Sequence, residues 1–314
     1  MIKPDYAIRV PYMLKELQEQ SRWLSRHASN ITSQRGEDGI IAKALSLLPE
    51  RTSWCVEFGA WDGKRHSNTY DLVKSHKYRG VFIESNPARF HDLELTHGAS
   101  GLNVLLNAFV GFSKSDCLDV LLCRCDIPAN FDLLSIDIDG NDYHVWEAMK
   151  EYRPKLVVIE YNPTLSNSIS FVQKKLNGLN QGSSPASLVE LARRKGYELI
   201  SVTALNLVFV SSEHFHLFGI ADNSLALMRD DSDGPQIFVG YDGHVFLAQA
   251  NVLGAIKLPW HHLELKEADV QVLTGRLQQY PDKYTRTEQL KVRLRSGLQH
   301  PRRFLQRVLH ACRG

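Results

Sequence analysis

Five short apolar runs, separated by stretches with helical periodicity, constrain the fold of this chain more than any other feature of its sequence. They read WCVEFGA, RGVFIES, NVLLNAFVG, DLLSIDID and KLVVIEYN, and lie between residues 54 and 162. Apolar runs without polar alternation are typical of strands that helices cover on both faces. We therefore expect a doubly wound α/β fold around a parallel sheet.

The stretch after these runs predicts how the sheet ends. Residues 187–210 read SLVELARRKGYELISVTALNLVFV. They contain a helical repeat, Gly196 as its C-cap, a strand, a turn at residues 204–206 and a second strand. Five parallel strands followed by a helix and a hairpin make a seven-stranded, mostly parallel sheet that closes near Ser211.

The remaining segments predict the domain organisation. Apolar residues at helical spacing indicate a helical N-terminal segment over residues 1–50, ended by Pro49. The α/β domain then spans 51–212. A C-terminal appendage with short strands follows over 213–284, and a basic amphipathic tail occupies 285–314.

Composition narrows the class of protein. The chain has 314 residues, of which 43% are hydrophobic and 23% charged, as in ordinary soluble globular proteins. Its five cysteines form no CxxC pair, which argues against a disulfide framework or a zinc site. The first twenty residues carry scattered charges and no long apolar stretch, so we expect a cytoplasmic protein.

The net charge of +2 is unevenly distributed. Residues 286–314 contain eight lysines and arginines against Glu288 alone. Two interpretations of this tail stay open: peripheral contact with an anionic membrane surface or glycan, and a solvated helix docked on its own domain. A long basic stripe interleaved with aromatic residues is missing, so we expect no nucleic-acid partner.

The first apolar run ends in the motif ExGxxxG, from Glu57 through Gly59 to Gly63. Its glycines allow a tight turn and close approach of a ligand, at the edge where doubly wound sheets bind their ligands. The motif lacks the GxGxxG spacing of a nicotinamide site. An acid before the first glycine suits a cationic amino-acid group better than a pyrophosphate.

The second run ends in Glu84. A carboxylate at the tip of this strand can accept hydrogen bonds from both hydroxyls of a ribose. The alternative is a surface carboxylate that caps the next helix, because Ser85, Asn86 and Pro87 are strong helix-start residues.

The fourth and fifth runs end in a group of acidic and amide side chains. Asp137, Asp139 and Asp142 follow the fourth run, and Glu160 and Asn162 end the fifth. Asp137, Glu160 and Asn162 offer hard oxygen ligands for Mg²⁺ or Mn²⁺, which would lower the pKa of a substrate hydroxyl. Without a metal, Asp139 and Asp142 would cap the helix that follows.

Six segments together resemble the FkbM-type class I S-adenosylmethionine-dependent methyltransferases. They are ITSQRGEDGII, VEFGAWDGKRHSNT, GVFIESNP, LLSIDIDGNDYHVW, VVIEYNP and SLVELARRKGYELI. The resemblance spans residues 34–211, and the order of the segments is more specific than any one of them. It implies S-adenosylmethionine as methyl donor, a last strand antiparallel to the rest, and O-methylation of a hydroxyl on a sugar, nucleotide sugar or surface glycan.

The resemblance also implies which residues contact the cofactor. By position, Glu57, Gly59 and Gly63 line the methionine part, Glu84 the ribose, and residues around Asn107 the adenine. The full predicted cofactor set is Glu57, Gly59, Ala60, Asp62, Gly63, Glu84, Ser85, Asn107, Ala108 and Asp137.

A second, local resemblance concerns FDLLSIDIDGNDY, which is similar to the fourth-strand segment of cation-dependent catechol-type O-methyltransferases. In those enzymes the first acid binds metal and the fifth strand ends in an adjacent Asp-Asn pair, whereas Tyr161 separates Glu160 from Asn162 here. Asp137 can instead act directly as the general base, with Glu160 beside it and His144 as a further catalytic candidate.

Two other function classes fit parts of the sequence. A glycosyltransferase would use Asp137 and Asp139 as a DxD metal site for a nucleotide sugar, but this would leave the ExGxxxG loop and Glu84 unexplained. A non-catalytic binding or scaffold module would use the same fold and the basic tail for assembly.

Overall fold

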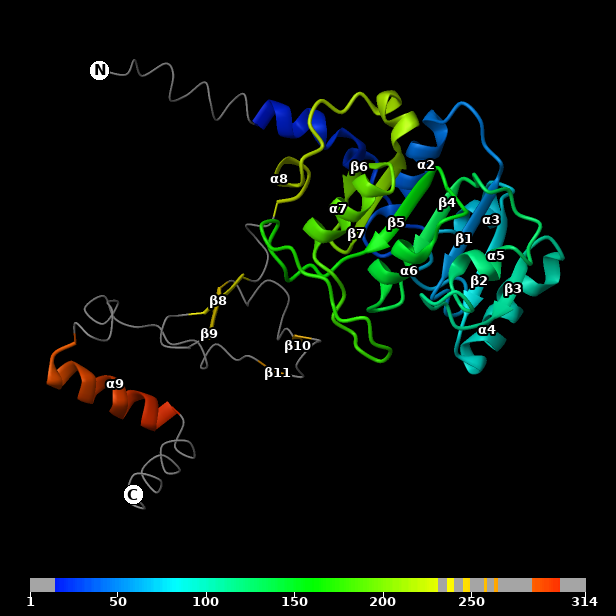
Figure 1. Cartoon of the computed structure of the whole chain (residues 1–314). Coiled ribbons are helices and arrows are strands. Elements are labelled where there is room, and N and C mark those ends of the chain that lie inside the picture. Colours follow the sequence, from blue (N-terminus) through cyan, green and yellow to red (C-terminus); the bar gives the residue numbers. More distant parts are fainter. Residues whose placement is uncertain are drawn as a thin grey trace, which may run out of the picture. The chain divides into compact units, whose positions relative to one another are not determined.

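The computed structural model describes residues 15–230, 236–239, 245–248, 257–258, 263–264 and 284–299. The chain forms two compact units, Met1–Ser232 and Asp233–Gly314. The first unit contains a seven-stranded sheet with helices on both faces (Figure 1). The sheet carries the residues from which a ligand site would be built.

The sheet has the order β3-β2-β1-β4-β5-β7-β6. Strands β1 to β5 are parallel, and β7 is antiparallel to both of its neighbours. The predicted doubly wound, seven-stranded sheet with an antiparallel last strand is therefore confirmed. The strands are β1 Trp54–Phe58, β2 Arg79–Glu84, β3 Val104–Asn107, β4 Leu133–Ile136, β5 Leu156–Glu160, β6 Tyr197–Val202 and β7 Asn206–Ser211.

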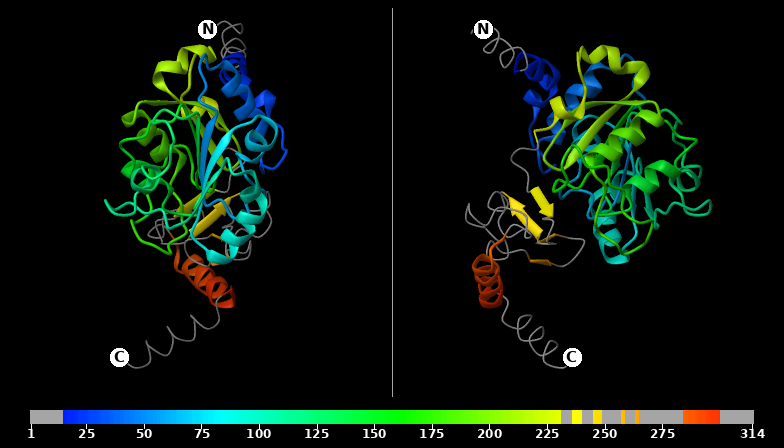
Figure 2. Two further views of the ribbon diagram at one scale, coloured as in Figure 1. Left: turned by 90° about the vertical axis from the view of Figure 1, so that its right-hand side faces the viewer. Right: turned by 60° about the vertical axis from the view of Figure 1, so that its left-hand side comes forward.

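Burial on both faces explains why the central strands lack polar alternation. Every residue of β1 and β4 is buried. Helices α2 and α4 lie on one side of the sheet and α6 and α7 on the other (Figure 2). Residues 15–21 are helical, and the helices described after them in this unit are α2 Glu37–Leu47, α3 Tyr70–Ser75, α4 Pro87–His97, α5 Leu118–Leu122, α6 Asp142–Ala148, α7 Pro185–Arg194 and α8 Leu225–Met228, with short 3₁₀ turns η1 Trp23–His27, η2 Gly98–Ser100 and η3 Ser212–Phe218.

A loop over residues 28–36 interrupts the helical pattern of the N-terminal segment. Asp38 Oδ2 holds this loop by accepting hydrogen bonds from three successive main-chain N–H groups, those of residues 31–33. Its neighbour Glu37 accepts hydrogen bonds from Thr203 Oγ1 and Asn206 Nδ2, at the turn between β6 and β7. The N-terminus of α2 is thereby fixed to the carboxyl edge of the sheet.

In its described residues, the second unit contains two antiparallel strand pairs and a helix. Strand β8 Gln236–Val239 pairs with β9 Val245–Ala248, and β10 Lys257–Leu258 pairs with β11 Leu263–Glu264. Short strands were expected in the appendage over 213–284, of which residues 233–284 fall in this unit and residues 213–232 in the first. Helix α9 Arg286–Gln299 covers the first half of the basic tail, and the rest of the tail, residues 300–314, lies outside the described residues.

None of the helices in the described ranges has the length and hydrophobicity needed to span a bilayer.

A buried ion pair joins three strands at their amino ends. Asp132, just before β4, accepts a 2.7 Å hydrogen bond from Lys155 Nζ, just before β5. The Asp132 carboxylate also accepts the main-chain N–H groups of Thr52 and Ser53, just before β1. The side chains of Asp132 and Lys155 are 0% and 7% exposed, so each charge depends on its partner.

We expect Lys155→Met to lower the free energy of unfolding by about 3–5 kcal/mol, because it leaves the Asp132 carboxylate buried without its counter-charge. Urea denaturation would measure the loss. The double variant Asp132→Asn/Lys155→Met should lose less than Lys155→Met alone, because no unpaired charge remains. Lys114→Met, at an exposed position, is the control. Equal losses in the single and double variants would contradict this account.

Candidate active site

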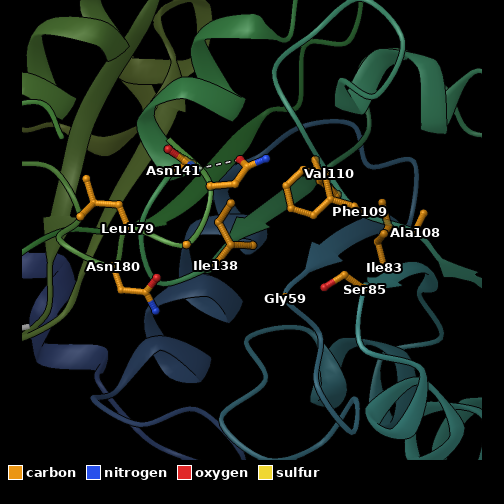
Figure 3. A pocket seen from close by; sticks show the side chains of 12 residues that line it. Gly59, Ile83, Ser85, Ala108, Phe109, Val110, Ile138, Asn141, Leu179 and Asn180 are labelled. Carbon is orange, nitrogen blue, oxygen red and sulfur yellow. Dashed lines mark hydrogen bonds between the residues drawn. The ribbon is translucent and has the colours of Figure 1, made fainter. Parts of the chain in front are cut away.

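A pocket of about 140 Å³ lies at the carboxyl edge of the sheet, beside the point where the strand order reverses between β1 and β4. The ends of four strands and one later loop contribute to its wall. In Figure 3, Phe109 and Ala108 lie on one side of the pocket and Leu179 and Asn180 on the other. The lining residues are Gly59, Ile83, Ser85, Ala108, Phe109, Val110, Ile138, Asn141, Asn177, Gly178, Leu179 and Asn180.

Gly59 brings the tip of β1 against the tip of β4. Its φ of +73° lies in the left-handed region, and a Cβ atom added there would lie 1.7 Å from the carbonyl oxygen of Asp137. No side chain fits at this position. The glycine that the sequence predicted to line the cofactor therefore also sets the distance between the two central strands.

Glu57 organises the loop after β1. Its buried carboxylate accepts hydrogen bonds from Ser67 Oγ at 2.6 Å, Thr69 Oγ1 at 2.7 Å and the main-chain N–H of Asn68 at 2.9 Å. Burial raises the pKa of Glu57, while these hydrogen bonds oppose the rise. The acid predicted to lie beside the methionine part thus has its oxygens engaged by its own loop.

Glu84 contacts the loop after β1 and the start of the segment after β2. Its Oε2 accepts the main-chain N–H of Trp61 at 3.0 Å, and its Oε1 accepts that of Asn86 at 2.7 Å. Asn86 is itself the N-cap of α4, so the helix is capped by this amide and not by Glu84. Each oxygen of Glu84 keeps a lone pair for a further donor, as a ribose clamp requires.

The other predicted cofactor residues differ in where they face. Ser85 and Ala108 line the pocket, and Asn107 Nδ2 donates to the carbonyl of Glu84 at 2.8 Å. Three residues shape the loop after β1 instead: Ala60 packs with Phe82 and Leu93, Asp62 accepts the N–H groups of Lys64 and Arg65, and Gly63 lies against Leu93 and His97 of α4.

Three carboxylates meet at the tips of β4 and β5. Oxygens of Asp137, Asp139 and Glu160 lie within 4.8 Å of one another. Burial raises the pKa of Asp137, and the neighbouring charges of Asp142 and Asp139 raise it further. Burial and the charge of Asp137 raise the pKa of Glu160 in the same way, which favours a proton held between the two carboxyl groups.

Asn162 does not join this cluster. Its Oδ1 accepts hydrogen bonds from the N–H and Oγ1 of Thr164 at 2.9 and 2.6 Å, and its Nδ2 donates to the carbonyl of Gln181. Both lone pairs of the amide oxygen are therefore in use. The sequence predicted Asn162 as the third ligand beside Asp137 and Glu160, whereas in the structure the third side chain of this group is Asp139. Three carboxylates are a donor set that suits Mg²⁺ or Mn²⁺.

Asp142 holds the loop before α6. Its two oxygens accept the N–H groups of Ile138 and Gly140 at 2.9 and 2.8 Å. The N-cap of α6 is Asn141, which makes no side-chain capping bond. The alternative in which Asp139 and Asp142 cap this helix therefore does not describe the loop.

His144 lies on α6 outside the carboxylate cluster. Its Nε2 donates to the carbonyl of Gln173 at 2.8 Å, and its buried Nδ1 has no hydrogen-bond partner within the described ranges. This contact anchors the loop after β5 to α6.

Residues 171–184 form a loop that supplies one side of the pocket. Gln173 is 1% exposed and donates to Asn141 Oδ1, while its own Oε1 accepts the N–H groups of Gln181 and Gly182. Between these anchors, residues 177–180 line the pocket. Composition indicates only a loop here, and no local signal distinguishes Gln173 from an exposed glutamine.

The sequence matches no protein-family model and no curated protein. Among solved structures, the chain is similar to a methyltransferase from Geobacter sulfurreducens, with 17% identity over 58% of this chain and 80% of that chain, and a TM-score of 0.36. It is also similar to the CurJ carbon methyltransferase, with 8% identity and a TM-score of 0.39 over 56% of this chain and 52%, about half, of that chain. A third is M. capricolum TrmK in complex with S-adenosyl-homocysteine, with 9% identity and a TM-score of 0.33 over 55% and 67% of the two chains. The α/β fold itself follows from the strand order and directions given above.

Proposed function

We propose that this chain is an S-adenosylmethionine-dependent methyltransferase that O-methylates a hydroxyl of a sugar, nucleotide sugar or surface glycan. One observation carries the proposal: a pocket lies at the strand-order reversal of a doubly wound sheet, with Glu84 at the adjoining tip of β2. The resemblance to FkbM-type enzymes supports the same donor and a hydroxyl acceptor.

The pocket offers complementary surroundings for each part of the cofactor. Ile83, Ala108 and Val110 give an apolar wall that suits a purine, and Glu84 accepts hydrogen bonds from the ribose. The methionine part then passes Gly59 toward Asp137. The carboxylates there favour the positive charges of the ammonium and sulfonium groups.

Methyl transfer needs little beyond positioning and proton removal. The carbon–sulfur bond breaks as the acceptor oxygen attacks in line, and the hydroxyl proton must leave. The raised pKa values of Asp137 and Glu160 favour a proton held between the two groups, and an ionised oxygen of the pair would then accept the hydroxyl proton. His144 is less suited to this role, because Nε2 is engaged by Gln173 and Nδ1 is buried.

A divalent cation is the alternative to the shared proton. Asp137, Asp139 and Glu160 would hold Mg²⁺ or Mn²⁺, and the bound ion would supply Lewis acidity that lowers the pKa of the acceptor hydroxyl. In either case the mutual repulsion of the carboxylates is neutralised before the acceptor arrives.

We expect Glu84→Gln to weaken binding of S-adenosyl-homocysteine at least tenfold in a calorimetric titration, because the ribose loses a charged acceptor. 5′-Methylthioadenosine, which has the same ribose but no amino-acid part, should lose affinity by a similar factor. Glu94→Gln, on an exposed position of α4, is the matched control. An unchanged affinity for 5′-methylthioadenosine would exclude Glu84 as the ribose ligand. Absence of binding to the wild-type protein would exclude the methyltransferase.

A second prediction concerns pH. Because the folded pKa of Glu160 is raised, the folded state binds more protons than the unfolded state above about pH 5, and stability falls as pH increases. Glu160→Gln should flatten this dependence and raise the melting temperature at pH 8 by roughly 2–4 °C for each kcal/mol of repulsion removed. The same variant should abolish methyl transfer.

Calorimetric melting at pH 5 and pH 8, with and without MnCl₂, would measure both effects. If MnCl₂ stabilises the wild type but not Glu160→Gln, the carboxylates bind the cation. If MnCl₂ does not stabilise the wild type, the result favours the shared proton. Glu151→Gln, at an exposed position, is the control. Parallel pH profiles for wild type and Glu160→Gln would contradict the account of the carboxylate pair.

A further inference from the structure

Two arginines stack on one tryptophan beside the pocket. The Cζ atoms of Arg89 and Arg65 lie 4.1 and 5.2 Å from the centroid of the Trp61 ring. Trp61 and Arg65 belong to the loop after β1, whereas Arg89 is in the first turn of α4. Two separate segments therefore bring their guanidinium groups to the same indole, which orients both.

No anionic partner of the two guanidinium groups lies in the part of the chain that the structure describes. Within residues 15–230, neither takes part in an ion pair or a side-chain hydrogen bond. The nearby carboxylates are already engaged by main-chain N–H groups, Asp62 by those of Lys64 and Arg65, and Glu84 by that of Trp61. Arg65 and Arg89 are exposed, so their charges are available to a ligand.

The stability of α4 does not account for Arg89. The first turn of this helix contains no acidic residue, and a cation near a helix N-terminus is electrostatically unfavourable. Arg65 adds a second positive charge to the same place. Stacking on Trp61 offsets part of this cost and keeps the charges together.

The stack adjoins the proposed ribose ligand. The main-chain N–H of Trp61 donates to Glu84 Oε2 at 3.0 Å, and both neighbours of Glu84, Ile83 and Ser85, line the pocket. Arg65 follows β1 and Arg89 lies in the first turn of the helix after β2, whereas the Asp137 cluster follows β4 and β5, so both groups belong to the carboxyl edge of the sheet.

We propose that Arg65 and Arg89 bind a phosphate group of the methyl acceptor, so that the substrate is a phosphate-bearing sugar. A guanidinium group donates two parallel hydrogen bonds to phosphate oxygens, and two such groups on one platform suit a phosphate or diphosphate. This inference rests on the proposed methyltransferase function for the identity of the acceptor. The anion site itself rests only on the arginines and Trp61.

Calorimetric titration of the full chain, loaded with S-adenosyl-homocysteine, with inorganic pyrophosphate tests the site. We expect saturable binding that the double variant Arg65→Ala/Arg89→Ala weakens at least tenfold and that falls steeply with added salt. The double variant Arg124→Ala/Arg193→Ala removes the same charge from exposed arginines elsewhere and should leave binding unchanged. Uridine diphosphate glucose and glucose 6-phosphate, with glucose as the uncharged control, then distinguish a nucleotide sugar from a sugar phosphate.

Three results would overturn the proposal. In the first, the wild type does not bind pyrophosphate. In the second, the two double variants bind pyrophosphate with equal affinity. In the third, Arg65→Ala/Arg89→Ala leaves pyrophosphate binding unchanged but lowers the affinity for S-adenosyl-homocysteine. The last outcome would assign the arginines to the cofactor carboxylate. If the wild type binds pyrophosphate through these arginines but does not bind S-adenosyl-homocysteine, the anion site is supported and the methyltransferase proposal is wrong.

Discussion

The contact between Gly59 and the main chain of Asp137 is the constraint on which the site depends. At this glycine the backbone of the β1 loop lies where a side chain would overlap the Asp137 carbonyl. The tips of the two central strands therefore lie as close as backbone atoms allow. That proximity places the loop held by Glu57 beside the carboxylates at the tip of β4, next to the pocket that Gly59 and Ile138 line. Any larger residue would separate them.

Side chains of opposite charge lie at different strand tips along the carboxyl edge of the sheet. Asp137, Asp139 and Glu160 concentrate negative charge at the tips of β4 and β5. Arg65 and Arg89 concentrate positive charge on Trp61, beside the tip of β2. A cationic sulfonium donor and an anionic acceptor would each be drawn to a different side, because Coulomb attraction is strongest where carboxylates or guanidinium groups are unpaired. This polarity agrees with the proposed chemistry.

Segment 171–184 completes the pocket with a polar network. Its ends are joined by hydrogen bonds between Phe171 and Ser184, and Gln173 secures it to Asn141. Its Leu179 carbonyl lies where a side chain at Gly140 would stand. Buried amides with all their hydrogen bonds satisfied hold a loop in one conformation better than exposed ones, because breaking any of them leaves an unpaired polar group. Hydrogen bonds of the folded chain therefore hold this side of the pocket in place.

The sequence alone determined the seven strands, their directions, and the meeting of Asp137 and Glu160 at one edge. Apolar runs and turn residues report local burial, and parallel strands bring their carboxyl ends together. Only the tertiary structure decided which side chains face the pocket. The Asn162 amide accepts a hydrogen bond from Thr164, Gly63 lies against α4, and Arg89 stacks on Trp61. These orientations depend on hydrogen bonds, packing and stacking between segments whose relative positions no local pattern encodes.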